Sequence, residues 1–175
     1  KEIEEANLSD VFWEIGLVQN LETSAINSPF FNVFLASQVR DNDNSLFMNG
    51  IKVRDLITTM GDVHHIFPKG YLQKNGITDK TKYNQIANYT YFDTQTNISV
   101  GVKPPCEYFR TVFIQCETKE PKLGNITDIE ILKENLRVNC IPENIAEMDA
   151  GHYEDFLKER RKLMAKKIKD YYYSL

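Results

Sequence analysis

The segment from Tyr153 to Tyr173 carries the clearest periodic pattern in the chain, and it restricts the possible folds more than any other feature. Apolar side chains recur there at helical spacing, which predicts an amphipathic helix with one face in a core. The residues that mark this face are Phe156, Leu157, Leu163, Met164, Ile168, Tyr171 and Tyr172. The pattern favours a mainly helical protein.

Most of the remaining chain also favours helices, with one short β-hairpin between them. Ser28-Pro29 is typical of a helix start, because Ser is a good cap and Pro is tolerated in the first turn. Tyr89–Phe92 has strong β-propensity, and Asp62–Ile66 is expected to form the other strand. Asp93-Thr94 offers an N-cap for a helix that holds Asn97. The other predicted helices are Glu2–Leu17, Phe30–Val39, Val53–Met60, Lys69–Lys74, Thr78–Ile86, Pro104–Phe113 and Asp128–Val138. We therefore predict a mainly α fold with a small embedded β-hairpin.

The composition is that of an ordinary globular domain, with 175 residues, of which 42% are hydrophobic and 26% charged. No apolar run reaches the ~18 residues that a membrane helix needs, and the charged start Lys1–Glu5 lacks the apolar core of a signal peptide. The cysteines Cys106, Cys116 and Cys140 are odd in number and form no Cys-x-x-Cys spacing, which favours a cytoplasmic protein. The first residue is Lys rather than Met, so we expect a fragment of a longer protein.

Two of the three histidines are adjacent, at His64 and His65. Such a pair alone is more often structural or incidental than functional, and a lone Asn is more often a cap or an exposed helix residue. Here the pair lies in the run Asp62-Val63-His64-His65-Ile66-Phe67-Pro68, and Asn88 and Asn97 follow, nine positions apart. An imidazole that titrates near neutral pH can accept a proton from water, so the combination indicates a candidate catalytic site.

This arrangement of a His pair before Pro, Ile-Ala-Asn before a strand, and a second Asn resembles the HNH, or ββα-metal, nuclease motif. It is most similar to the C-terminal domains of GmrSD-type restriction proteins and related phage-defence proteins. The resemblance implies a helical flanking segment over 1–60, an HNH core over 61–103 and a C-terminal helical segment over 104–175, all in one compact domain. It also implies an N-terminal ParB-like nucleotide-binding domain, which this sequence lacks.

The resemblance also implies a role for each motif residue. His65 matches the general base, and Asn88 matches the middle position, which orients the hairpin and the base by hydrogen bonds. His64 and Asn97 match metal ligands, although many relatives carry Asp or Glu where His64 stands. Mg²⁺ is the expected metal, and the nitrogen ligand keeps Mn²⁺ or another transition metal open. Asp62 shares a strand face with His64, so it is either a further ligand or a hydrogen-bond acceptor for a ligand imidazole.

Contacts to nucleic acid are expected from cations near the motif and on the last helix. Lys69 follows the histidines, and Lys158, Arg161 and Lys162 belong to a basic run on the C-terminal helix. Phosphate neutralisation requires such clustered cations, although a solvated helix face is the simpler interpretation of the same run. The net charge of −4 argues against strong DNA binding by this chain alone.

The resemblance thus implies a metal-dependent endonuclease that hydrolyses DNA phosphodiester bonds in prokaryotic restriction or anti-phage defence. Two alternatives stay open. The chain could be a degenerate HNH domain that binds DNA or a protein without catalysis, or the nuclease could act on RNA.

Overall fold

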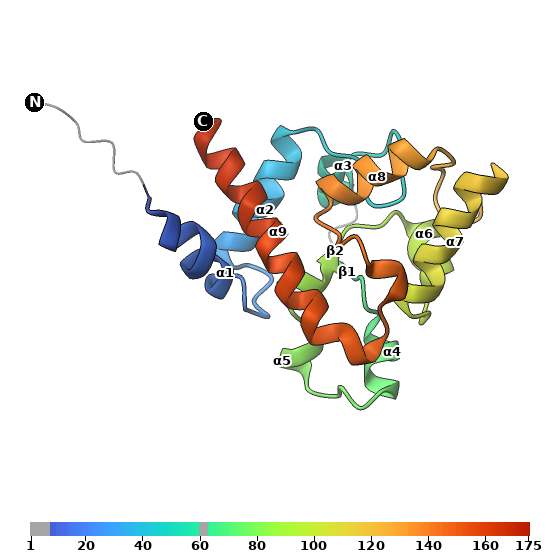
Figure 1. Cartoon of the computed structure of the whole chain (residues 1–175), viewed down its shortest axis with the longest axis horizontal. Coiled ribbons are helices and arrows are strands. Elements are labelled where there is room, and N and C mark those ends of the chain that lie inside the picture. Colours follow the sequence, from blue (N-terminus) through green and yellow to red (C-terminus); the bar gives the residue numbers. More distant parts are fainter. Residues whose placement is uncertain (1–7, 60–62) are drawn as a thin grey trace, which may run out of the picture.

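The computed structural model describes residues 8–59 and 63–175. Helices make up most of the chain, and a two-stranded antiparallel sheet lies between them (Figure 1). Strand β1 is His64–His65 and strand β2 is Tyr89–Thr90, with His64 opposite Thr90 and His65 opposite Tyr89. The predicted mainly α fold with a small antiparallel β element is confirmed, although both strands are shorter than expected.

The chain before the sheet is helical. A π-helical stretch, Phe12–Gly16, continues into α1, Leu17–Asn20. Helix α2 spans Pro29–Arg40 and begins with Pro in its first turn, as predicted, and α3 spans Val53–Thr59. The end predicted for α3 at Met60-Gly61 lies outside the described residues.

The first predicted helix, Glu2–Leu17, is described only from residue 8 onward. The α-helical spacing of Val11 and Ile15 predicts that both lie on its buried face, but the structure buries other positions. Trp13 and Leu17 are buried, whereas Val11 and Ile15 are 66% and 53% exposed. A π-helical turn holds more residues than an α-helical turn. Apolar positions assigned at α-helical spacing therefore point to solvent here.

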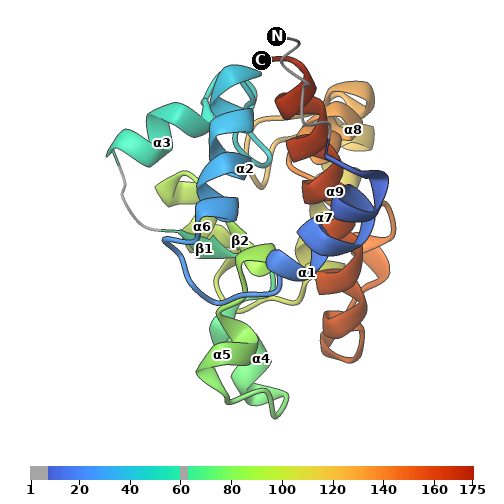
Figure 2. The same cartoon turned by 90° about the vertical axis from the view of Figure 1, so that its left-hand side faces the viewer.

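The connection between the two strands is long and contains α4, Lys69–Lys74, and α5, Lys80–Tyr83. Both helices extend from one end of the molecule (Figures 1 and 2). Helix α4 matches its predicted range, but the helix predicted over Thr78–Ile86 is limited to α5. The Asp79 side chain caps α5 by accepting from the Thr81 amide at 2.8 Å, and a 3-10 turn, Ile86–Asn88, leads into β2.

Two of the helices after β2 start at side-chain caps. Helix α6, Thr94–Val100, is capped by Asp93, and α8, Ile129–Val138, is capped by Asp128. Between them, α7 spans Pro105–Thr118 and again begins with Pro. The predicted helix starts are confirmed, and α7 extends five residues beyond its predicted end at Phe113.

Helix α9, Tyr153–Tyr173, crosses the molecule and packs against α2, α1 and the turn before β2 (Figure 1). The helix is as predicted, and Phe156, Leu157, Met164 and Ile168 are buried as expected, whereas Tyr172 is 40% exposed. Arg160 and Arg161 are buried, with 2% and 6% of their surface exposed, and Leu163, which was expected in the core, is 37% exposed. The two arginines lie four residues after Phe156 and Leu157, so they continue the same stripe.

One main hydrophobic cluster unites the three segments predicted from the sequence. It includes Leu17 and Phe34 from the first segment, Phe67 from the second, and Tyr108 and Phe156 from the third. The sheet thus lies inside a core that its flanking helices share. Among the helices of residues 8–59 and 63–175, none combines the length and the apolar character required to cross a bilayer.

Candidate active site

The register of the sheet places the two histidines on opposite faces of β1, because adjacent strand residues alternate. His65 lies edge-to-face on its strand partner Tyr89, with ring centroids 5.3 Å apart and an interplanar angle of 89°. His64 stacks on Phe92, with ring centroids 6.2 Å apart. Each imidazole is half-buried, so the sheet and the residues after it fix both rings.

His65 is held by a residue from outside the sheet. Its Nε2 atom lies 2.9 Å from the Oδ1 atom of Asn84, which follows α5. Burial lowers the pKa of His65 below the ordinary value of 6.5. The Asn84 hydrogen bond opposes this shift, while the nearby Lys69 and His64 lower the pKa further. The imidazole is therefore neutral at neutral pH, which is the state that can accept a proton.

Asn88 is fully buried and connects the segments that flank the sheet. Its Oδ1 atom accepts from the Phe67 amide at 2.8 Å, and its Nδ2 atom donates to the carbonyl oxygens of Phe67 and Tyr83 at 3.0 and 3.2 Å. Its backbone carbonyl accepts from the Ile66 amide at 2.9 Å. Asn88 thus fixes the chain directly after His65. Both polar atoms of its side chain are engaged in these hydrogen bonds.

The metal ligands implied by the motif are described in part. His64 lies on β1, and Asn97 is half-buried in the middle of α6. Asp62 lies outside the described residues. In the described part of the chain, no group of three or more His, Cys, Asp or Glu side chains could hold a metal ion. An imidazole and an amide oxygen fit a divalent ion that keeps several waters, and the nitrogen favours transition metals beside Mg²⁺.

The sequence did not predict the buried side chains that hydrogen-bond to the backbone in and next to the two strands. The buried Arg160 donates to the carbonyl oxygens of Ala87 at 2.8 Å, Tyr89 at 2.7 Å and Asn139 at 3.3 Å. Burial lowers the pKa of Arg160 to about 10. The Tyr108 hydroxyl donates to the carbonyl oxygen of Ile66 at 2.6 Å. The signal that could have identified Arg160 is its place on the apolar stripe of α9.

The predicted nucleic-acid contacts fall into two groups. Lys69, Lys158 and Lys162 are exposed, and the Lys69 ammonium lies 5.4 Å from the centre of the Tyr83 ring. The expectation that Arg161 contacts nucleic acid is corrected, because its guanidinium is buried. The guanidinium donates to Gln85 Oε1 at 3.0 Å and lies 3.6 Å from the Glu22 carboxylate. It is thus occupied inside the protein and does not belong to the exposed basic face of α9.

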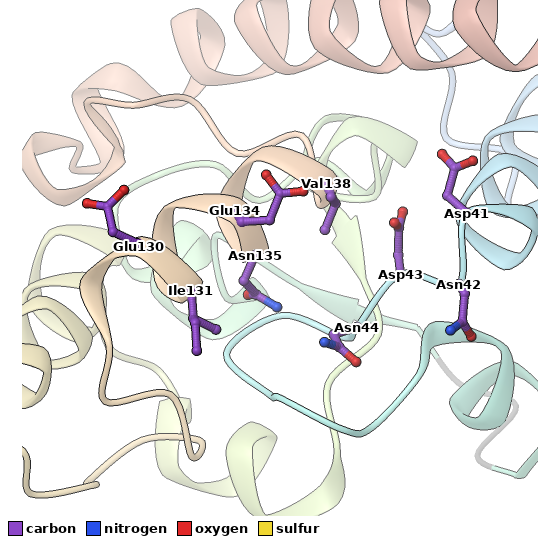
Figure 3. A pocket seen from close by; sticks show the side chains of 9 residues that line it. All are labelled: Asp41, Asn42, Asp43, Asn44, Glu130, Ile131, Glu134, Asn135 and Val138. Carbon is purple, nitrogen blue, oxygen red and sulfur yellow. The ribbon is translucent and has the colours of Figure 1, made fainter.

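A pocket of about 470 Å³ lies away from the histidines, between the chain after α2 and helix α8 (Figure 3). Its four carboxylates are all paired with cations. Lys167 lies 3.1 Å from Asp41 and 2.8 Å from Asp43, Lys133 pairs with Glu130, and Arg137 pairs with Glu134. Burial raises the pKa of Asp43, and Lys167 opposes that shift. The four carboxylates thus share three cations in an ion-pair network, so the histidine pair is the stronger candidate for catalysis.

Comparison with known proteins returned no match: no family model, no curated protein and no solved structure is significantly similar to this chain. The resemblance to HNH nucleases therefore rests on the motif residues of the sequence alone.

Proposed function

We propose that the chain is a metal-dependent endonuclease domain of the HNH type, with His65 as the general base. The observation that carries the proposal is the environment of His65. This half-buried imidazole lies on an antiparallel strand pair, is neutral at neutral pH and is hydrogen-bonded to Asn84. Asn88 fixes the chain that follows His65 by accepting from the Phe67 amide. Helix α6 with Asn97 follows that pair, in the order that the ββα-metal motif requires.

In this mechanism His65 accepts a proton from a water molecule as the water oxygen attacks phosphorus. A phosphorus–oxygen ester bond breaks, and the leaving oxygen takes up a proton from solvent. Asn84 holds the imidazole in position during the transfer. Lys69, exposed close to His65, would offset the negative charge of the phosphate.

A divalent metal ion would be held by His64 and Asn97, with Asp62 as a third ligand or as a hydrogen-bond partner of His64. When bound, it would stabilise the charge that develops on the scissile phosphate. Mg²⁺ is the first candidate, and Mn²⁺ or another transition metal follows because of the nitrogen donor.

The proposal extends to the biological setting through the resemblance alone. The substrate is DNA, the process is prokaryotic restriction or anti-phage defence in the cytoplasm, and a ParB-like nucleotide-binding domain precedes this chain in the complete protein. RNA cleavage is the second candidate activity, because the chemistry at phosphorus is the same for both polymers.

Plasmid nicking with added Mg²⁺ or Mn²⁺ tests the proposal. His65→Ala should reduce the rate by about 10²–10⁴-fold, the usual contribution of a general base, with the fold and metal binding retained. His64→Ala and Asn97→Ala should instead raise the metal concentration needed for activity. Nicking by His65→Ala at the wild-type rate would overturn the proposal. DNA binding with neither metal binding nor nicking would favour a degenerate, non-catalytic HNH domain, and a parallel RNA substrate tests the second activity.

A further inference from the structure

The connection between the two strands has an unusual charge for this protein. Residues 66–88 contain four lysines and one acidic residue, Asp79, a net charge of +3 in a chain whose net charge is −4. The lysines are Lys69, Lys74, Lys80 and Lys82. All four are exposed, and none forms an ion pair with a carboxylate of the described residues. We call these four side chains the α4–α5 lysine surface.

Helix α9 has the same net charge, because seven cations and four acidic residues lie between Tyr153 and Tyr173. Most of its cations are nevertheless engaged within the fold. Two are the buried arginines, Arg160 and Arg161. Lys158, Lys167 and Lys169 pair with Asp155, with Asp41 and Asp43, and with Asp10, respectively. Lys162 and Lys166 remain, so α9 presents fewer unpaired cations than its sequence indicates.

The α4–α5 lysine surface is connected to the candidate active site. Helix α4 begins four residues after His65, and Asn84, directly after α5, bonds the His65 ring. The two helices are fixed to the body through their backbone and through tyrosines. The Tyr153 hydroxyl donates to the Lys82 carbonyl at 2.9 Å, and the Ala150 amide donates to the Tyr71 hydroxyl at 2.9 Å. These contacts leave the lysine side chains in solvent, at the projecting end seen in Figure 2.

We propose that the α4–α5 lysine surface binds the phosphodiester backbone of duplex DNA and brings it to His65. Unpaired, exposed cations that replace the counterions of DNA are the main source of such affinity. Lysine recognises phosphate as a point charge, so binding here is independent of base sequence. The assignment rests on the proposed function for its substrate, and it replaces α9 as the main contact surface.

The test is duplex binding measured by fluorescence anisotropy at several salt concentrations, with a chelator present so that no cleavage occurs. The variant is the triple change Lys74→Gln, Lys80→Gln and Lys82→Gln. The matched control is Lys158→Gln, Lys162→Gln and Lys166→Gln, which removes the same charge from α9. At low salt the first variant should lose about 10- to 100-fold in affinity, and the slope of log K against log salt should fall by about 2–3. The control should stay within about threefold of wild type.

Equal losses in both variants, or no loss in the α4–α5 variant, would overturn the proposal, as would an unmodified protein that does not bind duplex DNA at low salt. Tighter binding of duplex RNA or heparin would overturn the choice of DNA as partner.

Amide chemical-shift changes in the unmodified protein on addition of duplex DNA give a second measurement that needs no variant. They should concentrate in residues 69–84. Changes centred on α9 would contradict the assignment. Binding is measured without metal and therefore does not depend on cleavage. A protein that binds duplex DNA through this surface but never cuts it would refute the nuclease proposal and leave the binding proposal intact.

Discussion

Asn84 determines which nitrogen of His65 is available for chemistry. Since Nε2 lies 2.9 Å from Asn84 Oδ1, a neutral ring that donates this proton keeps the lone pair on Nδ1. The pKa of His65 lies below 6.5, so the acid limb of an activity profile should have its midpoint below pH 6.5. At lower pH the ring becomes protonated and can no longer act as a base.

Asn84→Asp should raise the pKa of His65 by about one unit or more, because a carboxylate in hydrogen-bond contact stabilises the imidazolium. The acid limb of nicking activity should move to higher pH by the same amount, since the base is neutral only above its pKa. NMR titration of the ring protons without added metal measures the pKa directly. Asn144→Asp, an exposed site with the same charge change, should leave it unaltered. An unchanged or lowered pKa in Asn84→Asp would show that Asn84 does not contact the ring in solution.

At the scale of the elements, the antiparallel pair depends on α9. The two strands have only two residues each, which is too little for a sheet to be stable by itself. Arg160 compensates by donating to carbonyl oxygens on both sides of Asn88, at Ala87 and Tyr89. The cost is a buried guanidinium, and its pKa falls to about 10 as a result.

Arg160→Met should lower the free energy of unfolding by about 2–4 kcal/mol, because buried carbonyl oxygens lose their donors. Relief of the buried charge offsets part of that loss. Arg161→Met is the matched comparison and should cost about 1 kcal/mol, since Arg161 bonds one side chain and faces an exposed Glu22. Urea unfolding of both variants measures the difference. A smaller loss for Arg160→Met than for Arg161→Met would contradict the role given to Arg160.

Local signals in the sequence predicted the helix starts well. Asp93 and Asp128 cap α6 and α8 through their side chains, and such short-range bonds are encoded by neighbouring residues. The order of β1, β2 and α6 and the positions of the histidines on β1 also followed from the sequence.

Features that depend on distant contacts could not be predicted in this way. Asn84 reaches His65 across 19 residues, and Arg160 reaches Tyr89 across 71, so neither bond leaves a local signal. The charge of Arg160 and Arg161 favoured an exposed position, but the helical register of α9 placed both in the core. Tertiary packing therefore determines which of these side chains are buried, and the composition of the segment alone does not predict it.

For the molecule as a whole, the charge is unevenly divided. Residues 66–88 carry a net charge of +3, whereas the whole chain carries a net charge of −4. Most of the surface therefore repels a polyanion. This chain alone should bind duplex DNA no more tightly than about 10⁻⁴–10⁻⁶ M at physiological salt, without sequence preference. Anisotropy with several unrelated duplexes measures this. Nanomolar or sequence-selective binding would contradict this expectation and would mean that the chain recognises its target by itself.

The bond from Arg160 to Tyr89 also has a consequence for protein synthesis. A ribosome releases His64 and His65 long before it releases α9, because 71 residues separate Tyr89 from Arg160. Contacts of such wide sequence separation form late in folding, after the local helices. A growing chain therefore carries the histidines without the arginine that fixes their strand pair. On the proposed function, cutting activity arises only when translation has passed α9, so unfinished chains do not attack the nucleic acid of the cell that makes them.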